Sequence, residues 1–256
     1  MSSGIACVSR GMPGMDFIRA DSEVKLGVSA YAKYHLFGQD LYITTTHISI
    51  LIVVVVLLVS AFIANRKIKK ADPNAVPGPL MNVLELLVQS LDNLVVSNMG
   101  SKQAPKFANY IGALACFILV SNISGLLGLR APTADYGVTL SLALITWVMI
   151  QYNGFKYQKM GKIKGLFEPF FLFFPINLIS EFATPVSMSL RLFGNILSGS
   201  VMLALVYGLL PKVATLIWPA ALHAYLDLFS GAIQTFVFIM LTMVFVADAI
   251  GDEEAT

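Results

Sequence analysis

Five long apolar runs restrict what this chain can fold into more than any other feature of its sequence. The runs are Ile48–Ala64, Phe107–Leu129, Val138–Tyr152, Ile176–Leu210 and Pro219–Ala247. A helix needs about 20 largely apolar residues to cross a bilayer. Only 12% of the 256 residues are charged, against roughly 25% in soluble domains. The sequence therefore predicts an all-α, polytopic membrane protein with about five membrane-crossing helices.

Clustered cations predict how the chain is oriented. Four basic residues lie within 65–70, directly after the first run, and four lysines (Lys156, Lys159, Lys162 and Lys164) follow the third. Cytoplasmic loops carry an excess of Lys and Arg, so both clusters are expected in the cytoplasm. We expect a single membrane domain with an external N-terminal tail (1–46), a helical membrane region (47–250) and a cytoplasmic tail (251–256). Because over forty mostly polar residues precede the first run, we interpret that run as a span and not as a secretory signal.

The segment Leu80–Met99 has a different pattern. Leu84, Leu87, Val88, Leu91 and Val95 recur at helical spacing, whereas Glu85, Gln89 and Asp92 form a polar face. This periodicity indicates an amphipathic helix. We expect it along the cytoplasmic interface, and packing against other subunits is the alternative.

The last two apolar runs exceed the thickness of a bilayer. As single helices, Ile176–Leu210 and Pro219–Ala247 would be about 52 Å and about 43 Å long, whereas the hydrocarbon core is about 30 Å thick. Tilt or kinks can absorb the excess, and Pro185 is a candidate kink. We therefore expect two strongly tilted helices that form a hairpin around Pro211 and Lys212.

Arg191 is the only basic residue between Asn177 and Leu210. A cation at mid-membrane costs roughly 2.5–3.5 kcal/mol on translocon scales, so it indicates a functional site. At about 100° per residue, a set of small polar side chains projects within about 40° of Arg191. They are Asn177, Ser180, Thr184, Ser187, Asn195 and Ser198. A serine stripe alone is typical of close helix packing, but the arginine is not explained by packing.

The last run carries a second polar stripe. His223, Asp227, Ser230 and Gln234 are spaced 4, 3 and 4 apart and share an arc of about 60° on an α-helix. Such a set is suited to passing a proton or coordinating a small cation. The alternative is a hydrogen-bond cluster between the two long helices, with His223 at the membrane interface. An intramembrane Ser/His/Asp hydrolase is disfavoured, because no nucleophile setting is recognisable.

The stretch Ser189-Leu-Arg-Leu-Phe-Gly-Asn195 resembles the signature of subunit a of F-type ATP synthases. The resemblance continues through Gln234 and covers the chain from about Tyr34 to Asp248. It implies an ion-translocating stator in which Arg191 faces the carboxylates of the c-subunit ring and separates two half-channels. The implied partners are the c ring, the b-subunit peripheral stalk, the F1 sector indirectly, membrane lipid and transported H⁺ or Na⁺.

The resemblance also assigns residues to the ion pathway. Asn195 and Gln234 match positions close to the arginine, Asn122 matches one near the external half-channel, and Ser187 and Ser180 match the cytoplasmic path. The predicted ion pathway consists of these five residues together with Thr184, Glu181, Ser230, Asp227 and His223. The chain departs from the family at Ser200, where many relatives carry an acid or histidine, and at Asp227, where some carry His or Glu. We therefore expect Asp227 and His223 to replace the usual relay.

Several functions are disfavoured. The basic residues are short clusters flanking apolar runs, which does not indicate nucleic-acid binding. The cysteines, Cys7 and Cys116, lie far apart, and no Cys/His spacing predicts a metal site. We expect no cofactor, and without a Gly-rich phosphate loop the chain should not bind ATP itself. A secondary transporter or channel with a midplane arginine is the alternative function, although no internal repeat is visible. We expect a bacterial plasma membrane location, because no organellar transit peptide precedes the first span. An organelle-encoded chain, which would also lack a transit peptide, is the alternative.

Overall fold

The computed structural model describes residues 30–36, 39–70, 78–127, 129–159, 161–162, 167, 170–209, 222 and 224–251. Five helical segments within these residues are long and apolar enough to cross a membrane. Their helices are α1 (Thr45–Lys70), α3 (Ala104–Ile123), α4 (Tyr136–Tyr157), α6 (Phe174–Leu209) and α8 (Ser230–Ile250). The predicted class, an all-α multi-pass membrane protein, is confirmed.

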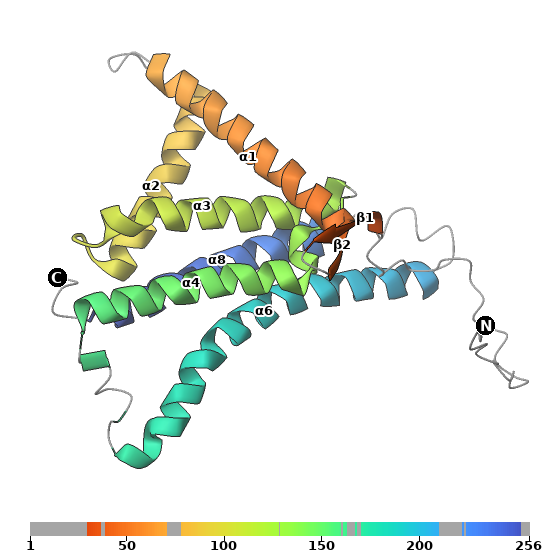
Figure 1. Ribbon diagram of the computed structural model, residues 1–256. Coiled ribbons are helices and arrows are strands. Elements are labelled where there is room, and N and C mark those ends of the chain that lie inside the picture. Colours follow the sequence, from red (N-terminus) through yellow and green to blue (C-terminus); the bar gives the residue numbers. More distant parts are fainter. Residues whose placement is uncertain are drawn as a thin grey trace, which may run out of the picture.

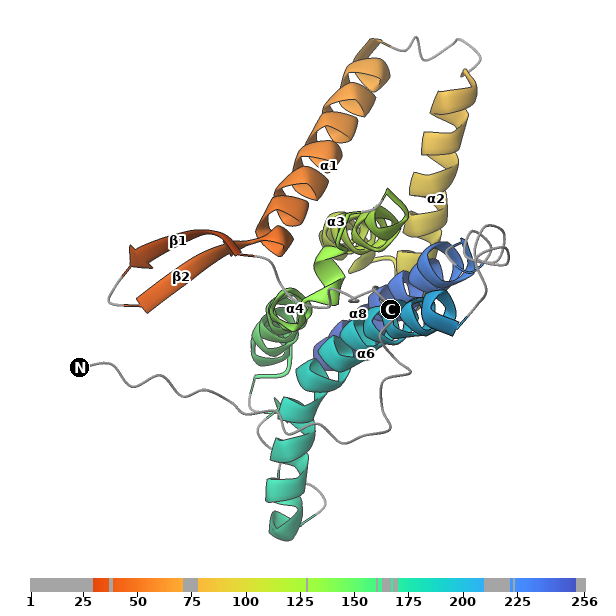
Figure 2. The same ribbon diagram turned by 90° about the vertical axis from the view of Figure 1, so that its right-hand side faces the viewer.

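Helices α3, α4 and α8 run side by side (Figures 1 and 2), and α6 packs against α4 and α8. The 3-10 turns η1 (Ser124–Leu127) and η2 (Pro132–Ala134) connect α3 to α4, and the Asp135 side chain caps α4 by accepting a hydrogen bond from the Gly137 amide at 3.0 Å. The core lies between these helices. Its largest buried side chains include Ile111, Ile118, Leu192, Phe238 and Met243. This bundle is the frame that positions the polar residues of α6 and α8.

Helix α1 projects away from the bundle, as Figure 1 shows. Most of its large apolar side chains are exposed, including Leu51, Leu58 and Phe62. An apolar helix that the rest of its own chain does not cover is expected where lipid takes the place of protein. Its exposure therefore agrees with the predicted first span.

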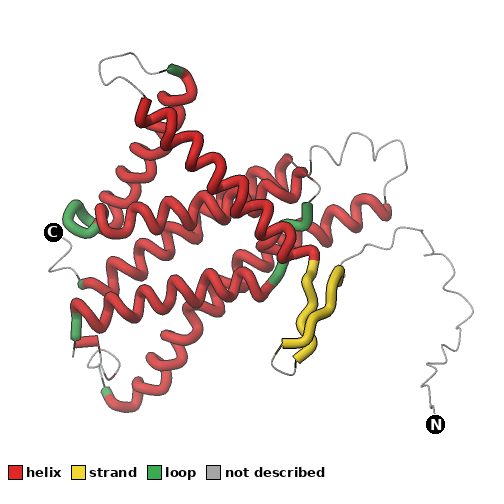
Figure 3. Tube along the Cα trace, turned by 45° about the horizontal axis from the view of Figure 1, so that its top comes forward, coloured by secondary structure: helices red, strands yellow, loops and turns green. Residues whose placement is uncertain are grey.

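A two-stranded antiparallel hairpin precedes α1 and lies beside its first turn (Figure 3). Its strands are β1 (Ala30–Leu36) and β2 (Gln39–Thr44). The aromatic and β-branched residues Tyr42, Ile43 and Thr44 favour an extended backbone. The hairpin falls inside the segment predicted as an external tail (1–46).

The amphipathic segment forms α2 (Pro79–Met99). Pro79 occupies the first turn, where its missing N–H costs no hydrogen bond, and Gly100 ends the helix at a φ of 75°. Only the final part of α2 is covered by other helices. Val95 and Met99 are buried against α3 and α8, whereas Leu87 and Val88 are exposed. Helix α2 is not among the five span-like segments. Its position along the membrane interface stays a prediction.

Helix α6 is one continuous helix of 36 residues, about 54 Å long. It changes direction partway along its length (Figure 1), and Pro185 lies inside it. Proline removes a backbone hydrogen bond and is a common cause of such bends. The predicted turn around Pro211 and Lys212 lies outside the described residues.

The last apolar region forms one helical span over Ala224–Ile250 within the described residues, but its helix type changes along its length. Ala224–Phe229 form a π-helix, η5, and the α-helix α8 begins only at Ser230. A π-helix bonds residue i to i+5, so each of its turns holds more residues than an α-helical turn. The angular positions that were calculated for Asp227 on a regular α-helix therefore do not apply to it.

Candidate functional site

Arg191 lies in the middle of α6, and its side chain is exposed. It borders a cavity of about 210 Å³ between α6 and α8. The other lining residues are Ser180, Ala183, Thr184, Ser187, Met188, Leu241 and Phe245. Among the residues that the structure describes, Arg191 has neither an ion-pair nor a hydrogen-bond partner. Its charge is thus available to a group outside this part of the chain.

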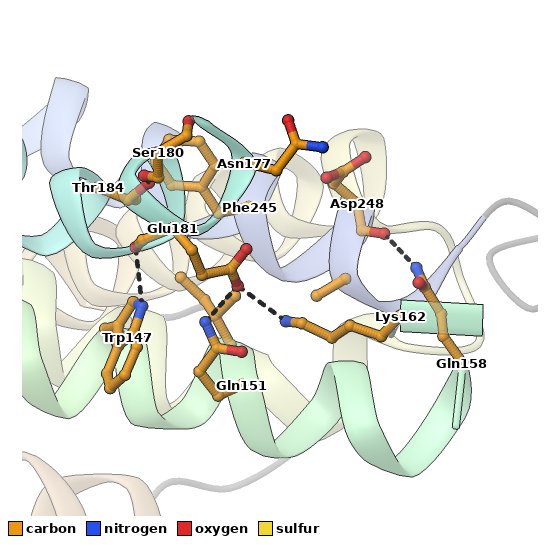
Figure 4. Close-up of a pocket in the computed structure, with 12 residues that line it drawn as sticks. Trp147, Gln151, Gln158, Lys162, Asn177, Ser180, Glu181, Thr184, Phe245 and Asp248 are labelled. Carbon is orange, nitrogen blue, oxygen red and sulfur yellow. Dashed lines mark hydrogen bonds and ion pairs between the residues drawn. The ribbon is translucent and has the colours of Figure 1, made fainter. Parts of the chain in front are cut away.

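A larger cavity of about 500 Å³ lies between the start of α6 and the ends of α4 and α8 (Figure 4). The polar and charged residues that line it include Gln151, Lys162, Asn177, Glu181 and Asp248. Ser180, Thr184 and Phe245 line both cavities. The two cavities are therefore neighbours along α6, and together they extend from that end of the bundle to Arg191.

Glu181 is held in the wall of the larger cavity by residues of α4 and of the segment that follows it (Figure 4). Gln151 donates a hydrogen bond from Nε2 to Glu181 Oε1, and the Lys162 ammonium lies 3.1 Å from the same oxygen. Trp147 Nε1 donates to the backbone carbonyl of Glu181 at 3.1 Å. Trp147 and Gln151 are one α-helical turn apart, so both face α6.

On the other side of Arg191, the side chains of α6 and α8 meet. Ser230 donates a hydrogen bond from Oγ to Asn195 Oδ1 at 2.9 Å. Gln234 is only 8% exposed. The amide nitrogens of Asn195 and Gln234 are buried and find no hydrogen-bond partner among the described residues. Two amide donors thus remain available close to the site, which is unusual for buried polar groups.

Asn122 is 1% exposed, and both polar atoms of its side chain are hydrogen-bonded. Its Oδ1 accepts from Thr133 Oγ1 at 2.8 Å, and its Nδ2 donates to the Gly231 carbonyl at 3.1 Å. A Cβ on Gly231 would lie 2.9 Å from the Asn122 Cβ. Asn122 therefore joins α3, η2 and α8 at a close backbone approach. The resemblance places it near the external half-channel, and in the structure it is a buried connection.

Asp227 lies on the π-helix, next to the turn that follows α3. A Cβ on Gly125 would be 3.7 Å from the Asp227 carboxyl carbon. The Asp227 carboxylate thus lies within van der Waals range of the Gly125 position. A π-helical turn frequently occurs at a functional site, where it changes the direction of a side chain.

The predicted site residues thus form two groups. Ser180, Glu181, Thr184 and Ser187 lie with Arg191 along the cavities, and Asn122, Asn195, Asp227, Ser230 and Gln234 lie on its other side. His223 lies outside the described residues. Sequence reasoning missed the roles of Gln151, Trp147 and Thr133, and it used Lys162 only to orient the chain. The spacing of Trp147 and Gln151 on one face of a predicted span was the available signal.

Comparisons with known proteins agree on one family. The model of the family "ATP synthase A chain" matches residues 47–247. A sodium-ion-specific ATP synthase subunit a of Propionigenium modestum is 42% identical over 196 residues, which cover 70% of this chain and 66% of that protein. Subunit a of Lysinibacillus sphaericus is 33% identical over 82% of this chain and 92% of its own. A chloroplastic subunit a of Stigeoclonium helveticum is 31% identical over 90% and 93%.

Proposed function

The chain belongs to the ATP synthase A chain family, and from this premise we propose that it is the stator that couples ion flow to rotation of a c-subunit ring. Membership of the family places it among the ion-translocating membrane subunits of ATP synthase complexes. In the proposal, the c ring passes alongside α6 and α8, and two half-channels load and unload its carboxylates.

One observation carries this proposal: two neighbouring cavities with shared lining residues lead along α6 to an arginine that has no anionic partner among the described residues. Arginine remains protonated in proteins because its pKa exceeds 12. A permanent cation at this point would attract an ionised carboxylate of the ring and favour release of its ion. It would also repel a cation that moved straight from one half-channel to the other.

The two groups of polar residues correspond to the two half-channels. The cavities along Glu181, Ser180, Thr184 and Ser187 are the proposed cytoplasmic route. Asn195, Ser230, Gln234 and Asp227 are the proposed external route, with His223 as a further member. In this orientation the N-terminal tail (1–46) is external and the C-terminal tail (251–256) is cytoplasmic. The peripheral stalk of b subunits would hold the chain against rotation, and the F1 sector would connect through that stalk.

The decisive experiment changes Arg191 in the assembled complex, reconstituted into lipid vesicles. Arg191→Ala should abolish ion-driven ATP synthesis, because the ring carboxylate loses its counter-charge, and passive ion leak should rise. Arg191→Lys should also fail or nearly fail, because lysine lacks the planar fork and its pKa falls readily on desolvation. Ser189→Ala is the matched control: among the described residues, this buried hydroxyl bonds only to the Val186 carbonyl of its own helix. Near-normal synthesis by an assembled Arg191→Ala complex would refute the stator mechanism.

The same vesicles identify the coupling ion and the class of protein. Separately imposed H⁺ and Na⁺ gradients should differ in their ability to drive synthesis, and the effective gradient names the ion. The sodium specificity in the name of the Propionigenium modestum relative makes the Na⁺ arm essential. Co-purification with a c ring and the F1 sector is expected. Gradient-driven transport by the isolated chain without a ring would instead favour a secondary transporter.

A further inference from the structure

Three charged side chains line the larger cavity among the described residues: Lys162, Glu181 and Asp248 (Figure 4). Lys162 Nζ lies 3.1 Å from Glu181 Oε1, and the two side chains are 11% and 30% exposed. Solvent screens such a partly buried pair less than a surface pair. The lysine therefore changes the electrostatic potential of this cavity appreciably.

The fold keeps space for the Lys162 side chain. A Cβ on Gly154 would lie 2.7 Å from both Cδ and Nζ of Lys162, so the lysine crosses α4 where that helix has no side chain. Its ammonium then meets the carboxylate oxygen that Gln151 also contacts. Lys162 is thus positioned at the wall of the ion route, and it is not a freely solvated loop residue.

We propose that Lys162 is a specificity-determining residue of the cytoplasmic half-channel: its ammonium offsets the Glu181 carboxylate, so the cavity admits a transported cation without retaining it. The inference rests on the proposed ion route. With both carboxyl groups ionised, the cavity carries one net negative charge, which still attracts cations. Without the ammonium, two carboxylates would face a narrow, partly dehydrated space, where an unpaired carboxylate binds a cation or a proton more strongly.

A charge-sensitive probe tests the electrostatic half of the proposal. Cys7 and Cys116 are replaced by serine, and Ser180→Cys places a reporter thiol at the junction of the two cavities. Intact complexes in inside-out vesicles are treated with small methanethiosulfonate reagents, one cationic and one anionic. The measured quantity is the ratio of the two modification rates. A general loosening of the structure alters both rates together, whereas a change in local charge alters their ratio.

Lys162→Met should raise the cation-to-anion ratio by roughly three- to tenfold, as expected for a unit charge a few ångströms away in a partly hydrated cavity. Glu181→Gln should lower it, and the double variant should return towards the parent. Lys162→Arg should preserve the parent ratio. Lys156→Met is the matched control, because Lys156 is an exposed lysine at the end of α4 that does not line the cavity. An unchanged ratio in Lys162→Met would overturn the proposal.

ATP synthesis tests the functional half. In otherwise wild-type complexes, Lys162→Met should lower the rate severalfold and make it more sensitive to monovalent cations on the cytoplasmic side, with Lys162→Arg as the rescue. If Lys162→Met changed the ratio of the two modification rates but left both ATP synthesis and its sensitivity to cations unchanged, the proposal would also be refuted. Either failure would leave the stator function intact, because that function is judged separately by Arg191→Ala.

Discussion

Asn195 and Ser230 form a hydrogen bond across the interface of the two long helices, from Ser230 Oγ to Asn195 Oδ1 at 2.9 Å. Each partner lies four residues from another site residue of its own helix, Arg191 on α6 and Gln234 on α8. The bond therefore fixes how the polar faces of the two helices are aligned beside the arginine. This contact matches the sequence-based alternative in which the last stripe holds the helices together, and it is compatible with a place in the external route.

The Asn195–Ser230 bond should appear as an energetic coupling. Ser230→Ala and Asn195→Ala should each slow ion-driven ATP synthesis, and the double variant should be little worse than the poorer single one. The coupling should be about 0.5–1.5 kcal/mol, the range for polar contacts between membrane helices. Initial rates from the four complexes, normalised to the assembled enzyme, give this value. Strictly additive effects would show that the two residues act independently.

Gly231→Ala should destabilise the bundle. The added Cβ would lie 2.9 Å from the Asn122 Cβ, an atom fixed to the backbone of α3, so the helices must separate. Overpacking of this kind typically costs about 1–3 kcal/mol. Less complex should be recovered, and it should dissociate at a lower temperature in detergent. Gly208→Ala is the control, because no atom of the described residues lies within 4 Å of the position of its Cβ. Equal stability of the two variants would contradict the close approach seen here.

Asp227→Asn should slow ion-driven synthesis substantially and leave assembly intact. The amide keeps the size of the side chain in the space beside Gly125 but loses the negative charge that attracts a cation in a medium of low dielectric constant. Coupled rates are compared at equal amounts of assembled complex. Wild-type rates in the variant would show that Asp227 serves only the structure.

The orientation of the chain can be tested with single cysteines in the background without Cys7 and Cys116. Probes at Lys69 and Lys159 should react with an impermeant reagent from the cytoplasmic side, because both belong to the cationic clusters. A probe at Ala134, in the turn between α3 and α4, should react only from outside. Labelling of positions 134 and 159 from the same side would overturn the proposed topology.

Contacts within one helix were largely predictable from the sequence, and contacts between helices were not. The placing of Ser180, Thr184 and Ser187 on the side of Arg191 follows from the helical period alone, and all four line one cavity. The pairing of Asn122 with Gly231, by contrast, depends on how α3 and α8 are rotated and shifted against each other. The contact of Lys162 with Glu181 depends on the missing side chain at Gly154. Composition and spacing do not encode such relations between helices.

The π-helix Ala224–Phe229 rotates the two parts of the last span relative to each other about the helix axis. It behaves as if one residue had been inserted into an α-helix, so the segment on its far side turns by about 100° relative to an uninterrupted helix. The side chains of Gln234 and of the core residues of α8 therefore keep their orientation towards the neighbouring helices, independently of how the residues before the π-helix are rotated. Loss of one residue from this turn would restore α-helical bonding and re-aim Asp227. A one-residue change in length at this position would then redirect the proposed external route while the residues beside Arg191 stay in place.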